Sequence, residues 1–154
     1  MFLPFVRVLA ALKVSPDTLT ALSFVCGLSA VVFLGDTSWF VLFAAFSLVF
    51  DVLDGHLARY LKRTSEKGRW LDYASDRLIE FLLLAFAPVG SLLSGVALLL
   101  FFLHQAGYLF FVRTVFYARS LLMLLFAFGL YEWGVLAASV VYAGGLLWQL
   151  KKAS

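Results

Sequence analysis

Long apolar runs, separated by short polar segments, make up most of this chain. By residue type, 64% of its 154 residues are hydrophobic and 14% are charged. Soluble domains carry about 45–50% apolar and about 25% charged residues, so this chain has too few polar side chains to cover a surface in water. A soluble enzyme, a disordered tail and a nucleic-acid-binding domain are therefore excluded, although the pI is near 9.2. We predict an all-α integral membrane protein, because such runs suit helices that span a bilayer.

Six segments of the sequence are candidates for membrane-spanning helices, which need roughly 17–25 mostly apolar residues. They cover residues 19–34, 38–61, 70–93, 95–112, 115–130 and 133–150. Polar residues mark the breaks: Gly35-Asp36-Thr37 is typical of a turn, and Glu132 interrupts the last apolar stretch. We expect one domain over residues 1–154, in which residues 16–150 form a six-helix bundle.

The first residues of the chain do not fit a span. Residues 2–14 hold two cations, Arg7 and Lys13, among apolar side chains and are too short to cross a bilayer. We expect residues 1–15 to form a juxtamembrane segment with an amphipathic helix that lies on the membrane surface. The alternative for this segment is a disordered tail.

The positive charges give the expected bundle an orientation. With six spans, all 12 lysines and arginines fall on one side of the membrane, while the loops of the other side carry only Asp36 and Glu132. By the positive-inside rule both termini are cytoplasmic. The expected location is the inner or plasma membrane, which the chain crosses several times.

Four aspartates lie where a membrane protein rarely places them. Asp51 and Asp54 follow the apolar run of the second candidate span, and Asp72 and Asp76 open the third. At about 100° per residue each pair shares one face of its helix, and the short loop between the helices makes them antiparallel neighbours. We therefore expect the four carboxylates to converge near the cytoplasmic end of the bundle. A structural salt-bridge network with nearby arginines is the alternative, but it does not explain why both helices present two acids on one stripe.

Carboxylates gathered in this way suit hard divalent cations such as Mg²⁺, Mn²⁺ or Ca²⁺. Four of them on two facing helices could hold two ions about 3.5–4 Å apart, which is the arrangement that clamps a phosphoryl group during displacement. Gly55 and Ala58 leave room for a bulky group beside the acids. The pattern therefore indicates metal-assisted phosphoryl chemistry at the membrane surface.

The spacing of these residues resembles that of a known family. The pattern Asp51-x2-Asp54-Gly55-x2-Ala58-Arg59-x8-Gly68-x3-Asp72-x3-Asp76 is similar at all eight fixed positions to the signature of the CDP-alcohol phosphatidyltransferases. Pro16-Asp17-x2-Thr20 resembles a further element that opens the first span in this family. The resemblance implies an enzyme that moves a phosphatidyl-type or archaetidyl-type group from a CDP-linked lipid to the hydroxyl of a small alcohol and releases CMP.

The resemblance also implies roles for individual residues. Asp51, Asp54, Asp72 and Asp76 would bind two ions, Mg²⁺ or Mn²⁺, and Asp76 would also take the proton of the acceptor hydroxyl as the catalytic base. The CDP group would contact a further set of residues: Asp17, Thr20, Gly55, Ala58, Arg59, Ser65 and Gly68. A homodimer, which is common in the family, and an active site that faces the cytoplasm complete this expectation.

The acceptor alcohol is the part of the reaction that the sequence constrains least. Arg113 and Arg119 would bind a phosphate on the acceptor, or they are ordinary positive-inside residues beside lipid headgroups. Asp76-Arg77 and the segment around Arg119 resemble the inositol-phosphate-using branch, although Tyr117 stands where that branch usually has a lysine. We expect a polyol phosphate such as inositol phosphate or glycerol phosphate. The alternatives are an unphosphorylated alcohol such as serine or inositol, a divalent-cation transporter, and an inactive membrane scaffold.

Overall fold

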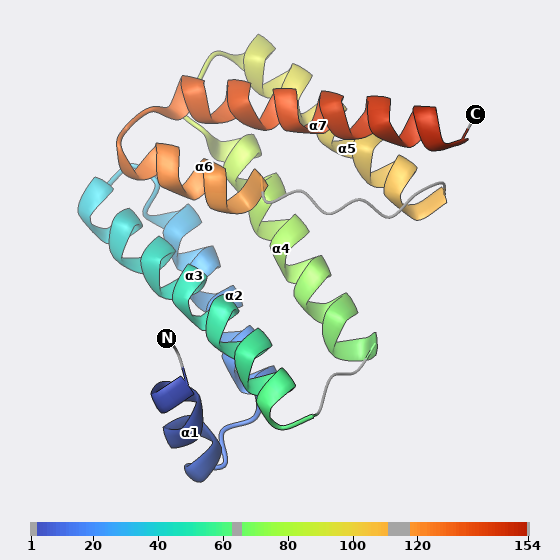
Figure 1. Cartoon of the computed structure of the whole chain (residues 1–154). Coiled ribbons are helices and arrows are strands. Elements are labelled where there is room, and N and C mark those ends of the chain that lie inside the picture. The colour runs from blue at the N-terminus through green and yellow to red at the C-terminus, as the bar shows by residue number, and fades with distance from the viewer. Residues whose placement is uncertain (1–2, 63–65, 111–117, 154) are drawn as a thin grey trace. The chain divides into compact units, whose positions relative to one another are not determined.

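The computed structural model of the chain is built from helices (Figure 1). It describes residues 3–62, 66–110 and 118–153, and within these ranges it contains seven helices and no strand. In chain order they are α1 (Leu3–Ala11), α2 (Pro16–Val32), α3 (Thr37–Tyr60), α4 (Glu66–Phe86), α5 (Ser91–Phe110), α6 (Ala118–Ala127) and α7 (Tyr131–Ala153). They form two compact units, Met1–Ile79 and Glu80–Ser154, with the boundary inside α4. The prediction of an all-α fold is confirmed for this part of the chain.

Polar side chains set the starts of α2 and α3. The Oγ of Ser15 accepts a hydrogen bond from the backbone N–H of Thr18 (3.2 Å), and Pro16 occupies the first turn, where its missing N–H costs no helical hydrogen bond. Asp36 caps α3 in the same way, because its carboxylate accepts from the backbone N–H of Ser38 (3.1 Å). The break predicted before α3 is thus a helix cap.

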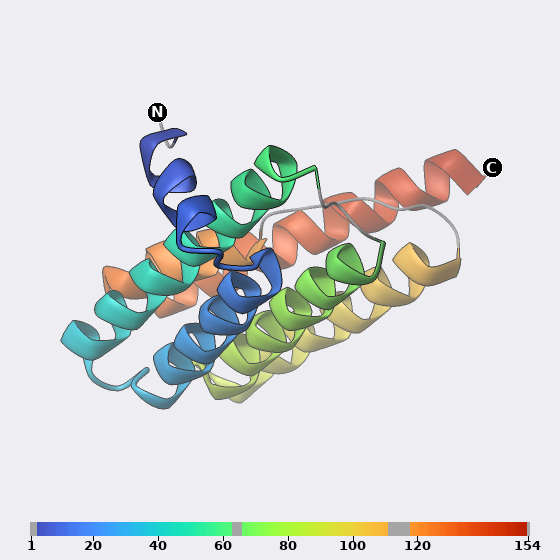
Figure 2. The ribbon, with the colours of Figure 1, turned by 90° about the horizontal axis from the view of Figure 1, so that it is seen from below.

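In the first unit α2 and α3 lie side by side (Figures 1 and 2). Two buried serines face each other across this contact: the Oγ of Ser23 donates to the backbone oxygen of Ser47 (2.9 Å), and the Oγ of Ser47 donates to that of Ser23 (2.8 Å). Gly27 follows one turn later on α2, where a Cβ atom would overlap the side chain of Ile79 from α4. Small side chains therefore let these helices approach closely, as is usual between helices in membranes.

α1 is a separate short helix, bent by 110° from α2 (Figure 2). Val6 of α1 is buried against Leu19 of α2 and Leu57 of α3. Phe5 and Leu12 of the same segment are exposed, at 67% and 68% of their surface. Val6, together with the partly buried Leu9 and Ala10, thus anchors α1 to the unit while other apolar side chains are exposed. Its place on the membrane surface stays a prediction.

In the second unit α7 packs against both α5 and α6 (Figure 1). Buried polar groups also join α7 to Glu80, in the part of α4 that belongs to this unit, and to α5. The hydroxyl of Tyr142 in α7 donates to the carboxylate of Glu80, and the Nε2 of Gln149 donates to the backbone oxygen of His104 in α5 (3.4 Å). Hydrogen bonds of this kind join helices across otherwise apolar contacts.

The break between α6 and α7 differs from the expectation. α7 begins at Tyr131, so that Glu132 lies in its first turn, where a negative charge is favourable. The break is made instead by Gly129, whose φ of +71° lies in the left-handed region and whose N–H bonds the backbone oxygen of Phe126 (2.9 Å). A glycine turn rather than a charged residue therefore ends the preceding apolar helix.

Two helices within the described residues are long and apolar enough to cross a membrane, Thr37–Tyr60 and Tyr131–Lys152. A third candidate arises if α1 and α2 are counted as one bent span, and residues Ser91–Ala106 of α5 and Ala118–Ala127 of α6 are shorter apolar stretches. The structure is therefore consistent with a membrane protein. Six spans with both termini in the cytoplasm stay a prediction.

Candidate active site

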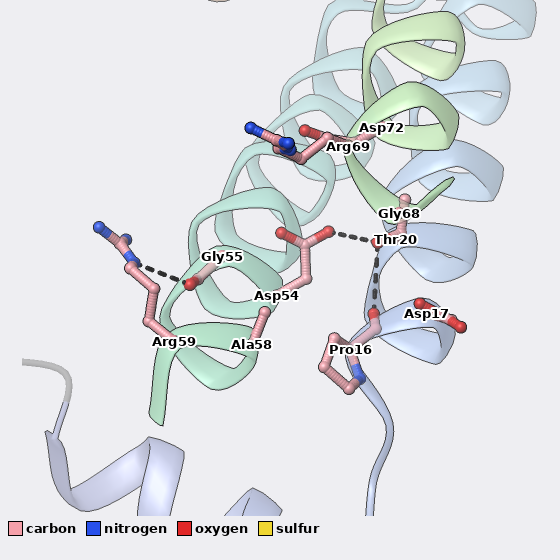
Figure 3. A pocket seen from close by; sticks show the side chains of 10 residues that line it. All are labelled: Pro16, Asp17, Thr20, Asp54, Gly55, Ala58, Arg59, Gly68, Arg69 and Asp72. Carbon is pink, nitrogen blue, oxygen red and sulfur yellow. Dashed lines mark hydrogen bonds between the residues drawn. The ribbon is translucent and has the colours of Figure 1, made fainter. Parts of the chain in front are cut away.

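Asp54, near the end of α3, points toward α2 (Figure 3). Its Oδ2 accepts a hydrogen bond from the Oγ1 of Thr20 at 2.6 Å, and Asp54 is only 7% exposed. A buried carboxylate needs such a partner, because the loss of its hydration is costly. Asp54, which is expected to bind metal, is therefore hydrogen-bonded to Thr20, which is expected to lie at the CDP group.

The other three aspartates of the motif gather at the facing sides of α3 and α4. One carboxylate oxygen from each of Asp51, Asp72 and Asp76 lies within 4.8 Å of the other two, and all three residues are half-buried. Two oxygens bound to one Ca²⁺ at about 2.3–2.6 Å can be up to about 5.2 Å apart, and for Mg²⁺ the limit is about 4.2 Å. These carboxylates are thus close enough to share a divalent cation after shifts of less than about 1 Å.

The four carboxylates were expected to converge, and the structure brings three of them together. Asp54 follows Asp51 by three residues, so that their Cβ atoms point about 60° apart around the helix. This angle lets Asp51 join the two aspartates of α4 while Asp54 contacts Thr20 of α2. Which partner each aspartate has depends on the sides of α3 against which α2 and α4 pack. The sequence does not show these sides.

A cavity of about 250 Å³ lies beside these aspartates (Figure 3). Its wall is formed by the start of α2, the last turns of α3 and the first turns of α4. The lining residues are Pro16, Asp17, Thr20, Asp54, Gly55, Ala58, Arg59, Gly68, Arg69 and Asp72. They include six of the seven residues expected at the CDP group, and the seventh, Ser65, lies outside the described residues. Asp72 belongs both to the cavity and to the group of three carboxylates, so the two features are continuous.

Arg59 lies along its own helix at the wall of the cavity. Its Nε donates to the backbone oxygen of Gly55 at 2.9 Å, and its Nη2 lies 3.5 Å from Nδ1 of His56. A Cβ atom on Gly55 would sit 3.8 Å from the Nη2 of Arg59, which is an ordinary contact. Glycine at this position therefore keeps the wall open rather than relieving a clash.

The part of the chain that forms the cavity also matches a known protein family. The sequence profile of the CDP-alcohol phosphatidyltransferase family matches residues 13–151, which include every residue of the cavity and of the carboxylate group. The chain belongs to this family. The resemblance drawn from the aspartate motif is thereby confirmed, and membership implies a membrane transferase of phospholipid biosynthesis.

Two curated relatives align with part of this CDP-alcohol phosphatidyltransferase. Each is named a bifunctional IPC transferase and DIPP synthase. The protein of Archaeoglobus fulgidus is 37% identical over 82 residues, and that of Aquifex aeolicus is 35% identical over 74 residues. The alignments cover 51% and 47% of this chain but only 17% of each relative. No solved structure matches the chain.

Arg69 also lines the cavity of this family member, although it is not a fixed position of the aspartate motif. It follows Gly68 directly and precedes Asp72 by three residues, so about one turn of α4 brings Arg69 and Asp72 to the same side. The Nη2 of Arg69 lies 3.4 Å from Oε1 of Glu66, in an ion pair whose side chains are 73% and 86% exposed. The signal that could have found it is its spacing, because it is an arginine one turn from an expected metal ligand.

Of the two arginines expected to bind the acceptor, the structure describes only Arg119. Arg113 lies outside the described residues. Arg119 lies in α6 of the second unit and is only 3% exposed, which does not fit a cation exposed to lipid headgroups. Among the described residues that line the cavity Arg119 does not occur, so its contact with an acceptor stays a prediction.

Proposed function

We propose that this chain transfers a phosphatidyl-type group, or its archaetidyl-type counterpart, from a CDP-linked lipid to the hydroxyl of a small alcohol and releases CMP. The observation that carries this proposal is the place of Asp72, which belongs to the cavity and to the group of three carboxylates. A nucleotide in the cavity would have its diphosphate beside oxygens that suit a divalent cation. Family membership supports the reaction type.

Mg²⁺ or Mn²⁺ fits the donor set of Asp51, Asp72 and Asp76, because each contributes a hard carboxylate oxygen. When bound, two such ions would neutralise charge on the diphosphate and on the departing CMP. Asp54 is proposed as a further ligand, oriented by the hydrogen bond that it accepts from Thr20.

Asp76 is proposed as the catalytic base. Its carboxylate would take the proton of the acceptor hydroxyl while the acceptor oxygen bonds to the phosphorus that carries the lipid. The bond between this phosphorus and the CMP oxygen breaks, so the electron pair leaves with CMP and the proton stays on Asp76. A base has to come within about 2.6–3.2 Å of the hydroxyl. Asp76 supports this role because its carboxylate neighbours that of Asp72, which lines the cavity.

The rest of the cavity would hold the CDP group. The small residues Gly55, Ala58 and Gly68 leave space along the wall, and Arg59 provides positive charge for the diphosphate. Further polar contacts with the nucleotide are proposed for Asp17, Thr20 and Ser65.

Inositol phosphate is the proposed acceptor, with glycerol phosphate as the second candidate. The names of the two relatives, IPC transferase and DIPP synthase, point to inositol-phosphate chemistry in those proteins. The pair Asp76-Arg77 of this chain resembles the corresponding pair of that branch. In the structure the guanidinium of Arg77 lies 5.6 Å from the ring centre of Tyr73. Arg113 and Arg119 are proposed as contacts of the acceptor's phosphate.

We also propose that the reaction takes place on the cytoplasmic side of the inner or plasma membrane, in a chain with six spans. The support is the position of all 12 lysines and arginines, which six spans place on one side. A homodimer is the remaining expectation from the family resemblance.

Release of CMP by the purified chain tests the proposed reaction. The protein in detergent is given CDP-diacylglycerol or a CDP-linked ether lipid with Mg²⁺ or Mn²⁺, and inositol phosphate, glycerol phosphate, serine and inositol are supplied in turn. We expect CMP release with inositol phosphate. Release with serine or inositol alone would assign the unphosphorylated acceptors instead. No release from any pair, together with cation uptake into proteoliposomes without nucleotide, would favour the transporter and contradict the proposal.

A further inference from the structure

The cavity is lined by both acidic and basic side chains. Three aspartates line it, Asp17, Asp54 and Asp72, against two arginines, Arg59 and Arg69. The CDP-linked donor of the proposed function carries a diphosphate, and such an anion binds best where guanidinium groups offer paired N–H donors. Arg59 already donates its Nε to the backbone of its own helix. Arg69, which the family motif does not include, is the second cation of the wall.

The present partner of Arg69 holds it only weakly. Its ion pair with Glu66 has an N–O distance of 3.4 Å, and both side chains are largely exposed. Exposed ion pairs of this kind contribute about 0.2–1 kcal/mol in water. A charge-assisted, bidentate contact with phosphate oxygens is stronger, because both groups are ionised and the guanidinium fork matches their geometry. A diphosphate in the cavity would therefore displace Glu66 from Arg69.

We infer that Arg69 binds the diphosphate of the CDP-linked donor, and that Glu66 holds the guanidinium at the rim of the cavity until the nucleotide arrives. This inference rests on the proposed function and adds a binding residue to it. Arg69 and Asp72 line the same cavity from one turn of α4 (Figure 3). The diphosphate would thus meet the guanidinium of Arg69 and, one turn further along α4, the carboxylate of Asp72. Arg69 is a binding residue and takes no part in proton transfer.

Arg69→Gln separates binding from chemistry. In the CMP-release assay we expect the KM for the CDP-linked lipid to rise about tenfold or more, as befits the loss of a charged hydrogen-bond partner, while kcat stays within about twofold. Arg69→Lys keeps the charge but not the fork, so we expect a smaller rise. Arg7→Gln, at an exposed arginine of α1, is the matched control and is expected to leave both constants unchanged.

Binding of CDP to the purified chain, measured by calorimetry in Mg²⁺, provides a readout without turnover. We expect Arg69→Gln to weaken CDP binding about as much as it raises the donor KM, and Glu66→Gln to leave CDP affinity unchanged or to raise it. Weaker CDP binding in Glu66→Gln would overturn the role of Glu66. Unchanged CDP affinity in Arg69→Gln would overturn the inference.

The same variants distinguish the donor's diphosphate from the phosphate of the acceptor. A rise in the KM for inositol phosphate, with the donor KM unchanged, would move Arg69 to the acceptor and overturn its assignment to the donor. If the wild-type chain binds CDP but transfers to no acceptor, the proposed function fails. The effect of Arg69→Gln on CDP binding then still decides the inference.

Discussion

The hydrogen bond from Thr20 to Asp54 is the smallest feature on which the candidate site depends. It joins α2 to α3 at the wall of the cavity, over a distance of 2.6 Å. Asp54 is buried, so its carboxylate has exchanged water for this hydroxyl and the other groups around it. Loss of the hydroxyl would affect both the stability of the first unit and the orientation of an expected metal ligand.

Thr20→Val keeps the shape of the side chain and removes the hydroxyl. Hydrogen bonds to charged groups contribute about 1.5–3 kcal/mol, so we expect a lower apparent Tm in detergent and weaker binding of CDP. Thr18→Val is the matched control, because Thr18 lies on the same helix and its exposed hydroxyl bonds only locally, to the Oγ of Ser15 (2.8 Å), among the hydrogen bonds that the structure shows for it. Equal Tm values for the two variants would show that the Thr20–Asp54 contact does not stabilise the protein.

Asp76→Asn tests the proposed base. The amide cannot take the proton of the acceptor hydroxyl, and general bases typically contribute about 10²–10⁴-fold to the rate. We expect kcat for CMP release to fall by this order, while CDP still binds at saturating Mg²⁺. Full turnover in this variant would refute the assignment of the base.

At the scale of the helices, close packing of α2 brings the motif residues together. The buried pair Ser23 and Ser47 and the adjacent Gly27 leave little volume between α2, α3 and Ile79 of α4. These helices carry every residue of the cavity. A change in their separation is therefore expected to disturb the site even where it touches no site residue.

Gly27→Ala adds one methyl group at this contact. The new Cβ would meet Ile79, which is fully buried and has little room to move, so we expect a loss of about 1–3 kcal/mol of stability. Gly144→Ala in α7 meets nothing within 4 Å, and alanine favours helices by about 1 kcal/mol over glycine. Thermal unfolding in detergent should therefore show a lower Tm for the first variant only. A Tm for Gly27→Ala at or above that of Gly144→Ala would contradict the close packing of Gly27 against Ile79.

Most of the helices could be predicted from the sequence because apolar runs and caps are local features, but α4 ends at Phe86 rather than at residue 93 of the predicted span. Asp36 and Pro16 mark helix starts whatever the rest of the chain does. The site could be predicted less completely. Spacing placed Asp51 and Asp54 on one face, but only the packing of α2 and α4 decides that they have different partners. The spacing of Arg69, one turn before Asp72, is the only sequence signal for it, and the cavity that it lines forms only when three helices pack together.

At the scale of the whole molecule, the distribution of positive charge predicts the membrane topology. Six spans would place all 12 lysines and arginines on one side, together with both termini. Two helices of the described residues are long and apolar enough to span by themselves. The topology therefore depends on the positive-inside rule more than on helix length.

The single cysteine of the chain makes this topology testable. In a Cys26→Ser background, Glu132→Cys and Lys152→Cys place a thiol at either end of α7, and both positions are exposed. We expect a membrane-impermeant maleimide to label position 132 in intact cells and position 152 only after permeabilisation. Labelling of both positions in intact cells would contradict the proposed orientation.

The proposed reaction depends on a divalent cation that Asp51, Asp72 and Asp76 together bind beside the cavity. Titration of the purified chain with Mn²⁺, followed by electron paramagnetic resonance, tests it most directly, with Asp36→Asn as the control because asparagine caps a helix as well as aspartate does. We predict that the wild type and Asp36→Asn bind Mn²⁺ equally, that Mg²⁺ competes, and that Asp51→Asn and Asp72→Asn each weaken binding about tenfold or more. Equal Mn²⁺ affinity in all four proteins would contradict the account.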